Sequence, residues 1–185
     1  MMTITTPPKL SFENYLNYDD GTDNRYELED GELILMNPPT FDHALIIRFL
    51  TNALEAEINR VNLPWITLHS IGVRTSINRS RIPDISVINR EQITHRDISA
   101  IVESAIIAVE IVSPESKIRD YRYKRSEYSV VGIPEYWIVD PNEQKITILQ
   151  LVEGLYEEQT YQGNQRIISL TFPELNLTPE QIFNL

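Results

Sequence analysis

The stretch from Ala105 to Val112 constrains the fold more than any other part of the sequence. Seven of its eight residues are apolar, a composition typical of a strand that is covered on both faces. The exception is Glu110, whose side chain shares one face of the predicted strand with Ala108 and Val112. A buried, ionised carboxylate without a partner is strongly destabilising. Glu110 is therefore either half of a structural ion pair or an acid that binds a cation or takes part in catalysis.

The residues after this run predict a β-α-β unit. A helix is expected from Ser113-Pro114 to about residue 131, where Gly132 ends it. Residues 136–139 then form a second apolar strand, which we expect to run parallel to the first. Glu110 lies near the carboxyl end of its strand, which is the end at which open α/β sheets bind ligands.

The remaining segments alternate between helical and strand patterns, which indicates an α/β fold. The clearest local signal is Asp30-Gly31, a type I′ turn pair that predicts a hairpin over residues 25–36. A stripe of apolar residues at helical spacing predicts a helix over residues 43–61. We further expect a short helix at 12–16, strands at 65–69, 71–77 (with a bend at Gly72), 82–88 and 145–152, a turn at 78–80, a loop with a helical turn over 89–104, a hairpin that joins 155–161 to 166–170 around Gly163, and a last helix opened by a capping box at 178–181.

Length and composition limit the kinds of site that the chain can carry. Its 185 residues suffice for one ordinary core, so we expect a flexible arm at residues 1–10 and a single domain over residues 11–185. The absence of cysteine excludes disulfides, zinc–thiolate sites and a cysteine nucleophile. No leader pattern and no run of about 18 apolar residues occurs, so we expect a cytoplasmic protein with no membrane segment. The net charge of -11 argues against a general nucleic-acid coat but allows a local basic patch.

Lys124 is the second unusual residue, because it lies within the apolar stripe of the predicted helix. Tyr121, Lys124 and Tyr128 recur at spacings of three and four, so they share the face that packs on the sheet. With a rise of about 3.3 Å per strand residue and about 1.5 Å per helix residue, Lys124 and Glu110 reach nearly the same height. The structural alternative is that Lys124 only neutralises Glu110, or pairs with Asp120 one turn earlier.

Asp84 and His43 are further candidates for the same site. Asp84 follows Pro83 at the start of a predicted strand, where an aspartate can be only a turn former. His43 continues the apolar stripe of its helix, so it is either a satisfied core histidine or a residue that lines a site. Glu27 and Glu32 lie in the hairpin and can simply be solvated.

The densest basic stretch of the chain follows the predicted strand of Glu110. It contains Lys117, Arg119, Arg122 and Arg125. Such a stretch is usually a solvated helix face, but this one borders the candidate site and could steer a phosphate backbone toward it.

These residues together resemble a known nuclease pattern. Asp84 follows a proline, Glu110 comes 26 residues later, and a lysine faces inward from the next helix. This arrangement resembles the PD-(D/E)XK nuclease superfamily, in which the Asp and Glu hold a divalent metal and the Lys positions or activates water. The resemblance is closer still to the Uma-type restriction endonucleases and covers about residues 12–185. It rests on residues 25–33 (RYELEDGEL), His43, Pro83-Asp84, residues 109–114 (VEIVSP), Asp120, Lys124, Tyr128 and residues 132–141 (GIPEYWIVDP).

One position departs from the superfamily pattern. The lysine normally stands two residues after the glutamate, where this chain has Val112. The resemblance implies that Lys124 has taken over that role from the helix, in agreement with its place in the apolar stripe.

The resemblance also implies a fold and an activity. The fold is restriction-endonuclease-like, a mixed central sheet flanked by helices with an N-terminal β-hairpin. The activity is a Mg²⁺-dependent DNA endonuclease, with Mn²⁺ as a substitute. Asp84 and Glu110 would hold the metal, Lys124 would assist catalysis, and His43 and Asp120 would line the site or bind substrate. The alternative is a catalytically inactive nuclease-fold protein that binds or scaffolds and whose buried charges only pair.

Two further expectations concern assembly and stability. Nucleases that cut both strands commonly act as two-fold dimers, and Tyr136-Trp137 with the hairpins after them favour an apolar surface, so we expect a homodimer. If Glu110 faces a hydrated metal site, Lys124→Met should slow cleavage and leave the melting temperature almost unchanged.

Overall fold

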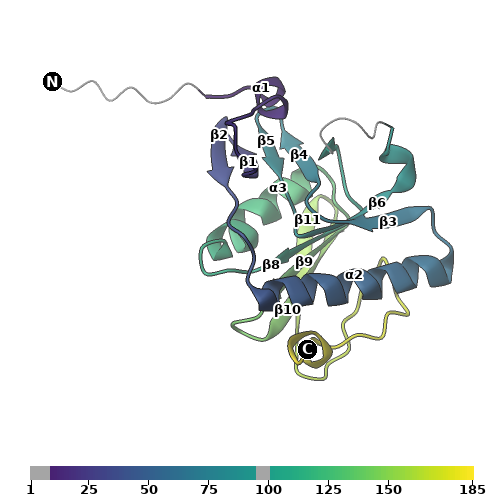
Figure 1. The fold of residues 1–185 in the computed structure, drawn as a ribbon. Helices are drawn as coiled ribbons and strands as arrows, with labels where there is room; N and C mark the ends of the chain where they lie inside the picture. Colours follow the sequence, from purple (N-terminus) through teal and green to yellow (C-terminus); the bar gives the residue numbers. More distant parts are fainter. Residues whose placement is uncertain (1–8, 95–100) are drawn as a thin grey trace.

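The computed structural model describes residues 9–94 and 101–185, which form two β-sheets with helices packed against them (Figure 1). Within these residues, one sheet has six strands in the order β11-β10-β9-β8-β6-β3, and the other has five in the order β2-β1-β5-β4-β7. In chain order the elements are α1 (Phe12–Leu16), β1 (Tyr26–Glu29), β2 (Glu32–Leu35), α2 (Phe41–Val61), β3 (Trp65–Leu68), β4 (Gly72–Ser76), β5 (Arg79–Arg81), β6 (Ile85–Asn89), the 3₁₀ turn η1 (Arg90–Gln92), β7 (Ile101–Val102), β8 (Ile107–Ile111), the π-helix η2 (Arg119–Lys124), α3 (Arg125–Val130), β9 (Glu135–Asp140), β10 (Lys145–Val152), β11 (Leu155–Gln162) and α4 (Pro179–Phe183).

The predicted β-α-β unit is confirmed and forms the centre of the six-stranded sheet. Strands β8 and β9 are parallel neighbours, with Ile107 opposite Glu135 and Ile111 opposite Val139. Strand β6 pairs antiparallel with the other side of β8, so the sheet is mixed. Every residue of β8 is buried, as its continuous apolar run predicts.

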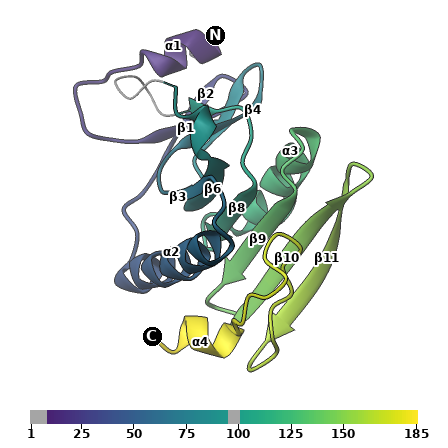
Figure 2. The same ribbon diagram turned by 90° about the vertical axis from the view of Figure 1, so that its right-hand side faces the viewer.

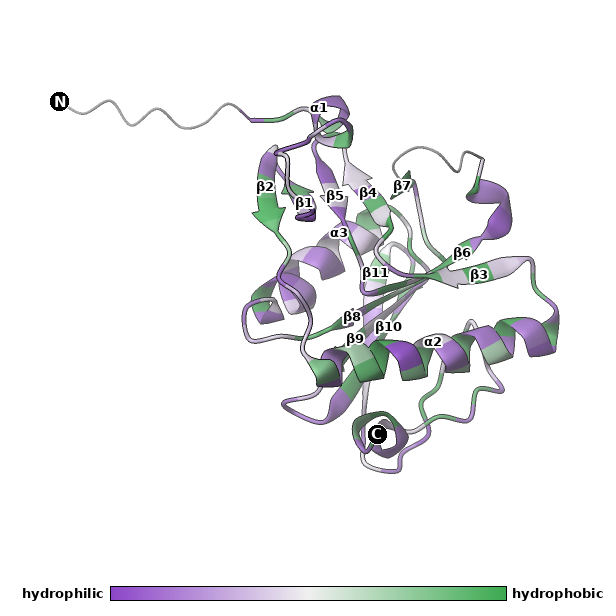
Figure 3. Ribbon diagram, in the orientation of Figure 1, coloured by the Kyte–Doolittle hydropathy of each residue, from purple (hydrophilic) through white to green (hydrophobic). Residues whose placement is uncertain are grey.

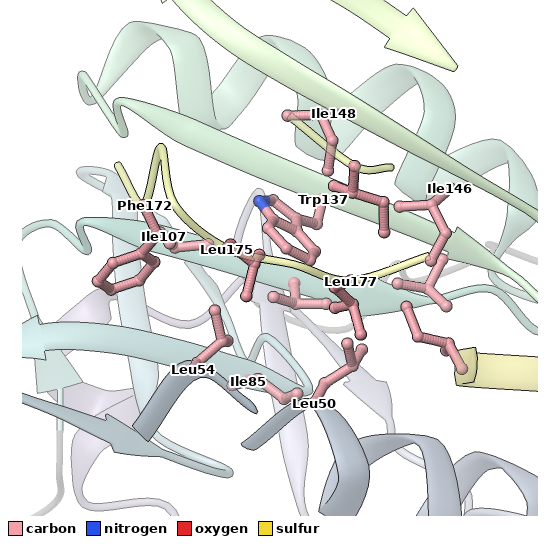
Figure 4. Packing of buried hydrophobic residues seen from close by; sticks show 14 of the residues in the cluster. Leu50, Leu54, Ile85, Ile107, Trp137, Ile146, Ile148, Phe172, Leu175 and Leu177 are labelled. Atoms are coloured by element: carbon pink, nitrogen blue, oxygen red, sulfur yellow. The ribbon is translucent and has the colours of Figure 1, made fainter. Parts of the chain in front are cut away.

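Opposite faces of this sheet are covered by different helices. On one face, Leu50 of α2 packs with Trp137 of β9 and with the chain before α4 (Figure 4). The buried residues of α2 recur every four positions and so share the face that packs on the sheet, while hydrophobic and hydrophilic residues alternate along the helix (Figure 3). On the other face, Tyr128 of α3 packs against Ala108 of β8. Because alternate strand residues share a face, Glu110 lies with Ala108 and points toward η2 and α3.

The N-terminal hairpin is confirmed, and it places β1 next to the centre of the molecule. Asp30 and Gly31 have φ values of 50° and 84°, as a type I′ turn requires. A side chain at position 31 would clash with Lys9, because a Cβ there would lie 2.8 Å from that residue's Cβ. Strand β1 pairs with β5 through Leu28 and Ser80, so the hairpin continues the smaller sheet.

The terminal segments are only partly described. Most of the predicted arm at residues 1–10 lies outside the described residues, although Leu10 N–H donates to the carbonyl of Gly31 at 2.8 Å. The predicted last helix is confirmed as α4, with both hydrogen bonds of the capping box at Thr178 and Gln181 (Figure 2). None of the helices in the described part of the chain combines the length and the apolar character that crossing a membrane requires.

Several segment predictions differ from the structure. Strands β3 and β4 belong to different sheets, and the chain breaks at Ser70, with a φ of 57°, rather than bending at Gly72. The predicted turn at 78–80 overlaps strand β5, because residues 79–81 pair with β1 and β4. The helical turn predicted within the loop over 89–104 is confirmed as η1, but the loop also contains the short strand β7, and its residues 95–100 lie outside the described part.

The prediction of a hairpin between residues 155–161 and 166–170 is also wrong. Strand β11 pairs with β10 along its whole length, and residues 166–170 form no strand. The turn between β10 and β11 is Glu153-Gly154, with φ values of 50° and 84°, which is the same tight geometry as Asp30-Gly31. The sequence does not predict this turn, because its first residue is a glutamate and the usual residues at that position are Asn, Asp and Gly.

Candidate active site

Glu110 and Lys124 meet, as the helical periodicity predicts. The Nζ atom of Lys124 lies 2.9 Å from Oε2 of Glu110, and both side chains are buried. Lys124 is the last residue of the π-helix η2, where the sequence predicts an ordinary α-helix. Such turns are rare and frequently occur at functional sites.

Lys124 also contacts two other carboxylates. Oδ1 of Asp120 and Oε1 of Glu27 each lie 3.3 Å from Nζ. The other oxygen of Asp120 accepts a hydrogen bond of 2.5 Å from the hydroxyl of Ser116. Both of the pairs that the sequence allowed for Lys124 are therefore present at once, together with a third from the hairpin.

The carboxylates around Lys124 have unequal pKa values. Burial raises the pKa of Glu110 well above its usual range; Lys124 opposes this shift and neighbouring carboxylates reinforce it. Burial likewise raises the pKa of Asp120. Burial also acts to raise the pKa of Glu27, but Lys124 and Arg81 outweigh it and the pKa falls below its usual value. Glu27 faces two cations, Lys124 and Arg81, whereas Glu110 faces only Lys124, which accounts for the opposite directions of their pKa shifts.

Tyr128 fixes the second oxygen of Glu110. Its hydroxyl donates to Oε1 of Glu110 at 2.7 Å, and its ring packs edge-on against that of Tyr136. Burial raises the pKa of Tyr128 well above its usual range, so the hydroxyl keeps its proton and remains a donor. Both carboxylate oxygens of Glu110 thus have a partner within the protein.

Asp84 lies immediately before β6 and is held against β8. Its Oδ2 accepts a hydrogen bond of 2.7 Å from the backbone N–H of Ile111, the residue after Glu110. Its Oδ1 lies 3.0 Å from Nε2 of His43, at the first turn of α2. The ring of His69 lies 3.2 Å from the carbonyl of Asp84 through Nδ1. These contacts bring Asp84 and His43 to the strand that carries Glu110.

The hairpin contributes a buried ion-pair network that the sequence reasoning missed. Arg81 is fully buried, and its Nη1 lies 3.1 Å from Glu27 and 2.9 Å from Glu29. Its Nε and Nη2 donate to the two oxygens of Glu127 at 2.7 and 2.6 Å. Glu27 and Glu29 are two residues apart on a strand and so share a face, which was the available signal for a common cation. Glu32, by contrast, is exposed.

Two adjoining pockets define the accessible part of the site. The smaller, of about 120 Å³, is lined by Glu27, Asp84, Glu110 and Lys124 among others. The larger is a cleft of about 940 Å³. Asp84 and His43 line both pockets, so the larger cleft leads to the smaller. Asp120 lines neither, so it acts on the site only through Lys124.

The donor atoms at the small pocket suit a hard cation. Asp84 and Glu110 both present carboxyl groups there, and burial together with the neighbouring acids raises the pKa of Glu110, so a bound cation would favour its ionised form. Within residues 9–94 and 101–185, no group of three or more His, Cys, Asp or Glu side chains is arranged to hold a metal. Mg²⁺, however, commonly binds one or two carboxylates and completes its shell with water and phosphate oxygens. The residues present therefore fit such an ion.

Comparisons with known proteins show the fold and the family of the chain. A solved structure described as a putative nuclease belonging to DUF820 from Anabaena variabilis ATCC 29413 superposes with a TM-score of 0.79, and it covers 95% of this chain and 98% of that chain. At 18% identity this likeness shows the fold, which confirms the predicted mixed α/β fold with its N-terminal hairpin. No curated protein sequence matches the chain. The model of the Uma2 family, described as "Putative restriction endonuclease", matches residues 12–180. This match spans most of the sequence, so the chain belongs to the Uma2 restriction endonuclease family and has a nuclease fold.

Proposed function

We propose that this protein is a Mg²⁺-dependent endonuclease that hydrolyses phosphodiester bonds in DNA. The observation that carries the proposal is the convergence of Asp84, Glu110 and Lys124 on one small pocket beside a much larger cleft. Three elements far apart in the sequence supply these side chains, on a fold shared with a nuclease family. Two carboxylates and one lysine are the groups that metal-assisted phosphodiester hydrolysis needs.

Asp84 and Glu110 are the proposed metal ligands. When bound, Mg²⁺ supplies positive charge that polarises the phosphate and lowers the pKa of a nearby water. The protein keeps both carboxylates in place beforehand, because His43 and the Ile111 N–H hold Asp84 while Tyr128 holds Glu110. A preorganised site needs little rearrangement during the reaction.

Lys124 is the proposed catalytic cation. Carboxylates keep its pKa well above the usual range despite burial, so the ammonium stays charged at neutral pH. It can donate a hydrogen bond to the attacking water or to a phosphate oxygen on which negative charge develops. Hydrolysis then adds the water oxygen to phosphorus and breaks the bond to one of the two ester oxygens.

A second candidate function has a specific observation in its favour. Both oxygens of Glu110 already have partners, Lys124 and Tyr128, and those of Asp84 contact His43 and the Ile111 N–H. A closed network of this kind suits a nuclease-fold protein that binds or scaffolds without catalysis. Exclusion of any metal from the wild-type pocket would favour this reading.

Titration with Mg²⁺ or Mn²⁺ separates the two functions. For the nuclease we expect calorimetry to show saturable binding of the ion, and supercoiled plasmid to be cleaved in Mg²⁺ but not in EDTA. The binding step should disappear in the double variant Asp84→Asn, Glu110→Gln, which serves as the matched control. Absence of both ion binding and cleavage in the wild-type protein would reject the nuclease in favour of the closed network.

We also propose that the protein is a homodimer. Tyr136 and Trp137 do not supply the apolar surface expected of them, because both are fully buried in the core. The proposal now rests on strand β11, which ends the larger sheet, and on the exposed Leu155 at its start. Light scattering at micromolar concentration should give twice the mass of one chain. The mass of a single chain would contradict the dimer.

A further inference from the structure

Arg119 is a cation at the small pocket that lacks an anionic partner. Its side chain lines the pocket together with Glu110 and Lys124. Its Nε is buried, yet this atom has no hydrogen-bond partner among the described residues, and the guanidinium makes no ion pair with them. A buried donor without an acceptor is unfavourable, because it has lost water and gained nothing in return.

Lys124 and Arg25, the lysine and arginine that line the pockets besides Arg119, differ from it in their partners or their position. Lys124 contacts the carboxylates of Glu110, Asp120 and Glu27. Arg25 lines only the larger cleft and donates to the hydroxyl of Ser70 at 2.5 Å. Lys124 and Arg119 are the lysine and arginine that line the small pocket in the described structure, and of the two only Arg119 has no carboxylate partner.

We infer that Arg119 is the phosphate-binding residue of the substrate site. A guanidinium presents several N–H groups in a planar fork, which matches two oxygens of a phosphate. A phosphate oxygen would give the buried Nε of Arg119 the acceptor that it lacks. This inference rests on the proposed function, and it assigns to Arg119 one phosphate of a DNA strand.

The sizes of the two pockets agree with this assignment. The small pocket, of about 120 Å³, is several times smaller than the cleft beside it, and it suits a compact group such as a phosphate better than a whole nucleotide. The cleft of about 940 Å³ is large enough for the sugars and bases on either side. A strand in the cleft would therefore direct one phosphate into the pocket, where Arg119 offsets the repulsion of the acidic cluster.

The test compares Arg119→Ala with Arg122→Ala. Arg122 lies in the same helical turn and carries the same charge, but it is exposed and lines neither pocket, which makes it a matched control. Binding of a short fluorescein-labelled DNA duplex is measured by anisotropy in EDTA over a series of salt concentrations. We expect Arg119→Ala to weaken binding about tenfold for every sequence tried and to lower the slope of log K against log salt by about one. Arg122→Ala removes the same charge from the basic stretch without a pocket contact, so it should lose clearly less in both measurements.

Three further measurements make the assignment specific. Arg119→Lys keeps the charge but loses the fork, so we expect it to recover part of the affinity. The melting temperature of Arg119→Ala should not fall, because the side chain contributes no ion pair to the fold. In cleavage assays, KM should rise for Arg119→Ala, whereas Arg122→Ala should raise it clearly less.

The outcomes separate this inference from the proposed function. If the wild type binds DNA in an Arg119-dependent manner but never cleaves it, the endonuclease proposal fails and the phosphate site stands. If the wild type cleaves DNA and Arg119→Ala changes neither the salt slope nor KM, the phosphate site is overturned and the endonuclease stands. Absence of DNA binding by the wild type would overturn the inference outright.

Discussion

Glu110→Gln and Asp84→Asn are each expected to lower Mg²⁺-dependent cleavage at least about a hundred- to a thousandfold, the loss that follows removal of one preorganised charge contact. Amides are poorer ligands than carboxylates for a hard cation, so each variant loses affinity for the ion as well as activity. Gel assays of plasmid cleavage and calorimetric titration with Mn²⁺ measure the two losses separately.

Both variants should fold. Glu110 is one of several acids crowded around Lys124, and its pKa is already raised, so a neutral amide of the same shape removes repulsion as well as attraction. The control is Glu135→Gln, which changes a buried glutamate of neighbouring β9 that bonds to Trp137 and Thr171 and lines neither pocket. It should keep full activity in whatever fraction is folded. Cleavage at the wild-type rate by Glu110→Gln or Asp84→Asn would disprove the metal assignment.

The parts of the fold that could be predicted from sequence are those set by local chemistry. The Asp30-Gly31 turn, the capped helix α2 and the capping box of α4 each depend on residues a few positions apart. The β-α-β unit of β8 and β9 was equally predictable, because two apolar strands joined by a helix allow few topologies. The strand predictions are wrong where the choice of partner depends on distant parts of the chain. Strand β11, for example, pairs with β10 rather than with residues 166–170.

The candidate site was predictable for a different reason. Lys124 and Glu110 each break an apolar pattern, and a charge within a packing face must find a partner. Their contact at 2.9 Å follows from periodicity and the rise of strand and helix alone. The π-helical form of η2 was not predictable, because it depends on how the segment packs rather than on its residue types.

Arg81 and Glu27 could not be placed from sequence. They come from strands of the smaller sheet that lie some fifty residues apart and meet only because β1 pairs with β5. Glu27 then contacts both Arg81 and Lys124 and so joins the hairpin to the candidate site. Glu27, which the sequence allowed to be solvated, is thus a buried member of the network of Arg81 and Lys124.

That network changes the expected effect of Lys124→Met. The sequence-based expectation of an almost unchanged melting temperature assumed that Glu110 opens to water, but Glu110 is 3% exposed and Lys124 5%. With methionine at this position, Glu110, Asp120 and Glu27 lose their shared cation inside the protein. We now expect a loss of about 3–5 kcal/mol in the free energy of unfolding without metal, measured by urea denaturation at neutral pH.

The control for stability is Lys117→Met, in the same segment. Lys117 is half exposed and pairs with the exposed Glu143 and with Asp140, a buried residue at the end of β9. Asp140 keeps hydrogen bonds from the backbone N–H groups of Asn142 and Glu143 when Lys117 is removed, so this variant should lose much less stability than Lys124→Met. A small loss in Lys124→Met as well would mean that the carboxylates find other partners, and would contradict the structural part of this prediction.

The cleavage rate of Lys124→Met shows whether Lys124 does more than neutralise the carboxylates around it. We expect the folded fraction of Lys124→Met, assayed well below its melting temperature, to cleave DNA at least about a hundredfold more slowly than the wild type, because the ammonium no longer reaches the attacking water or the phosphate. Added Mg²⁺ should recover part of the lost stability, since a divalent ion that binds only the folded state stabilises it and also replaces the missing charge. It should not recover the rate. Normal cleavage by the folded fraction would show that Lys124 is only a counter-ion for Glu110, Asp120 and Glu27, and that the chemistry belongs to other groups of the pocket.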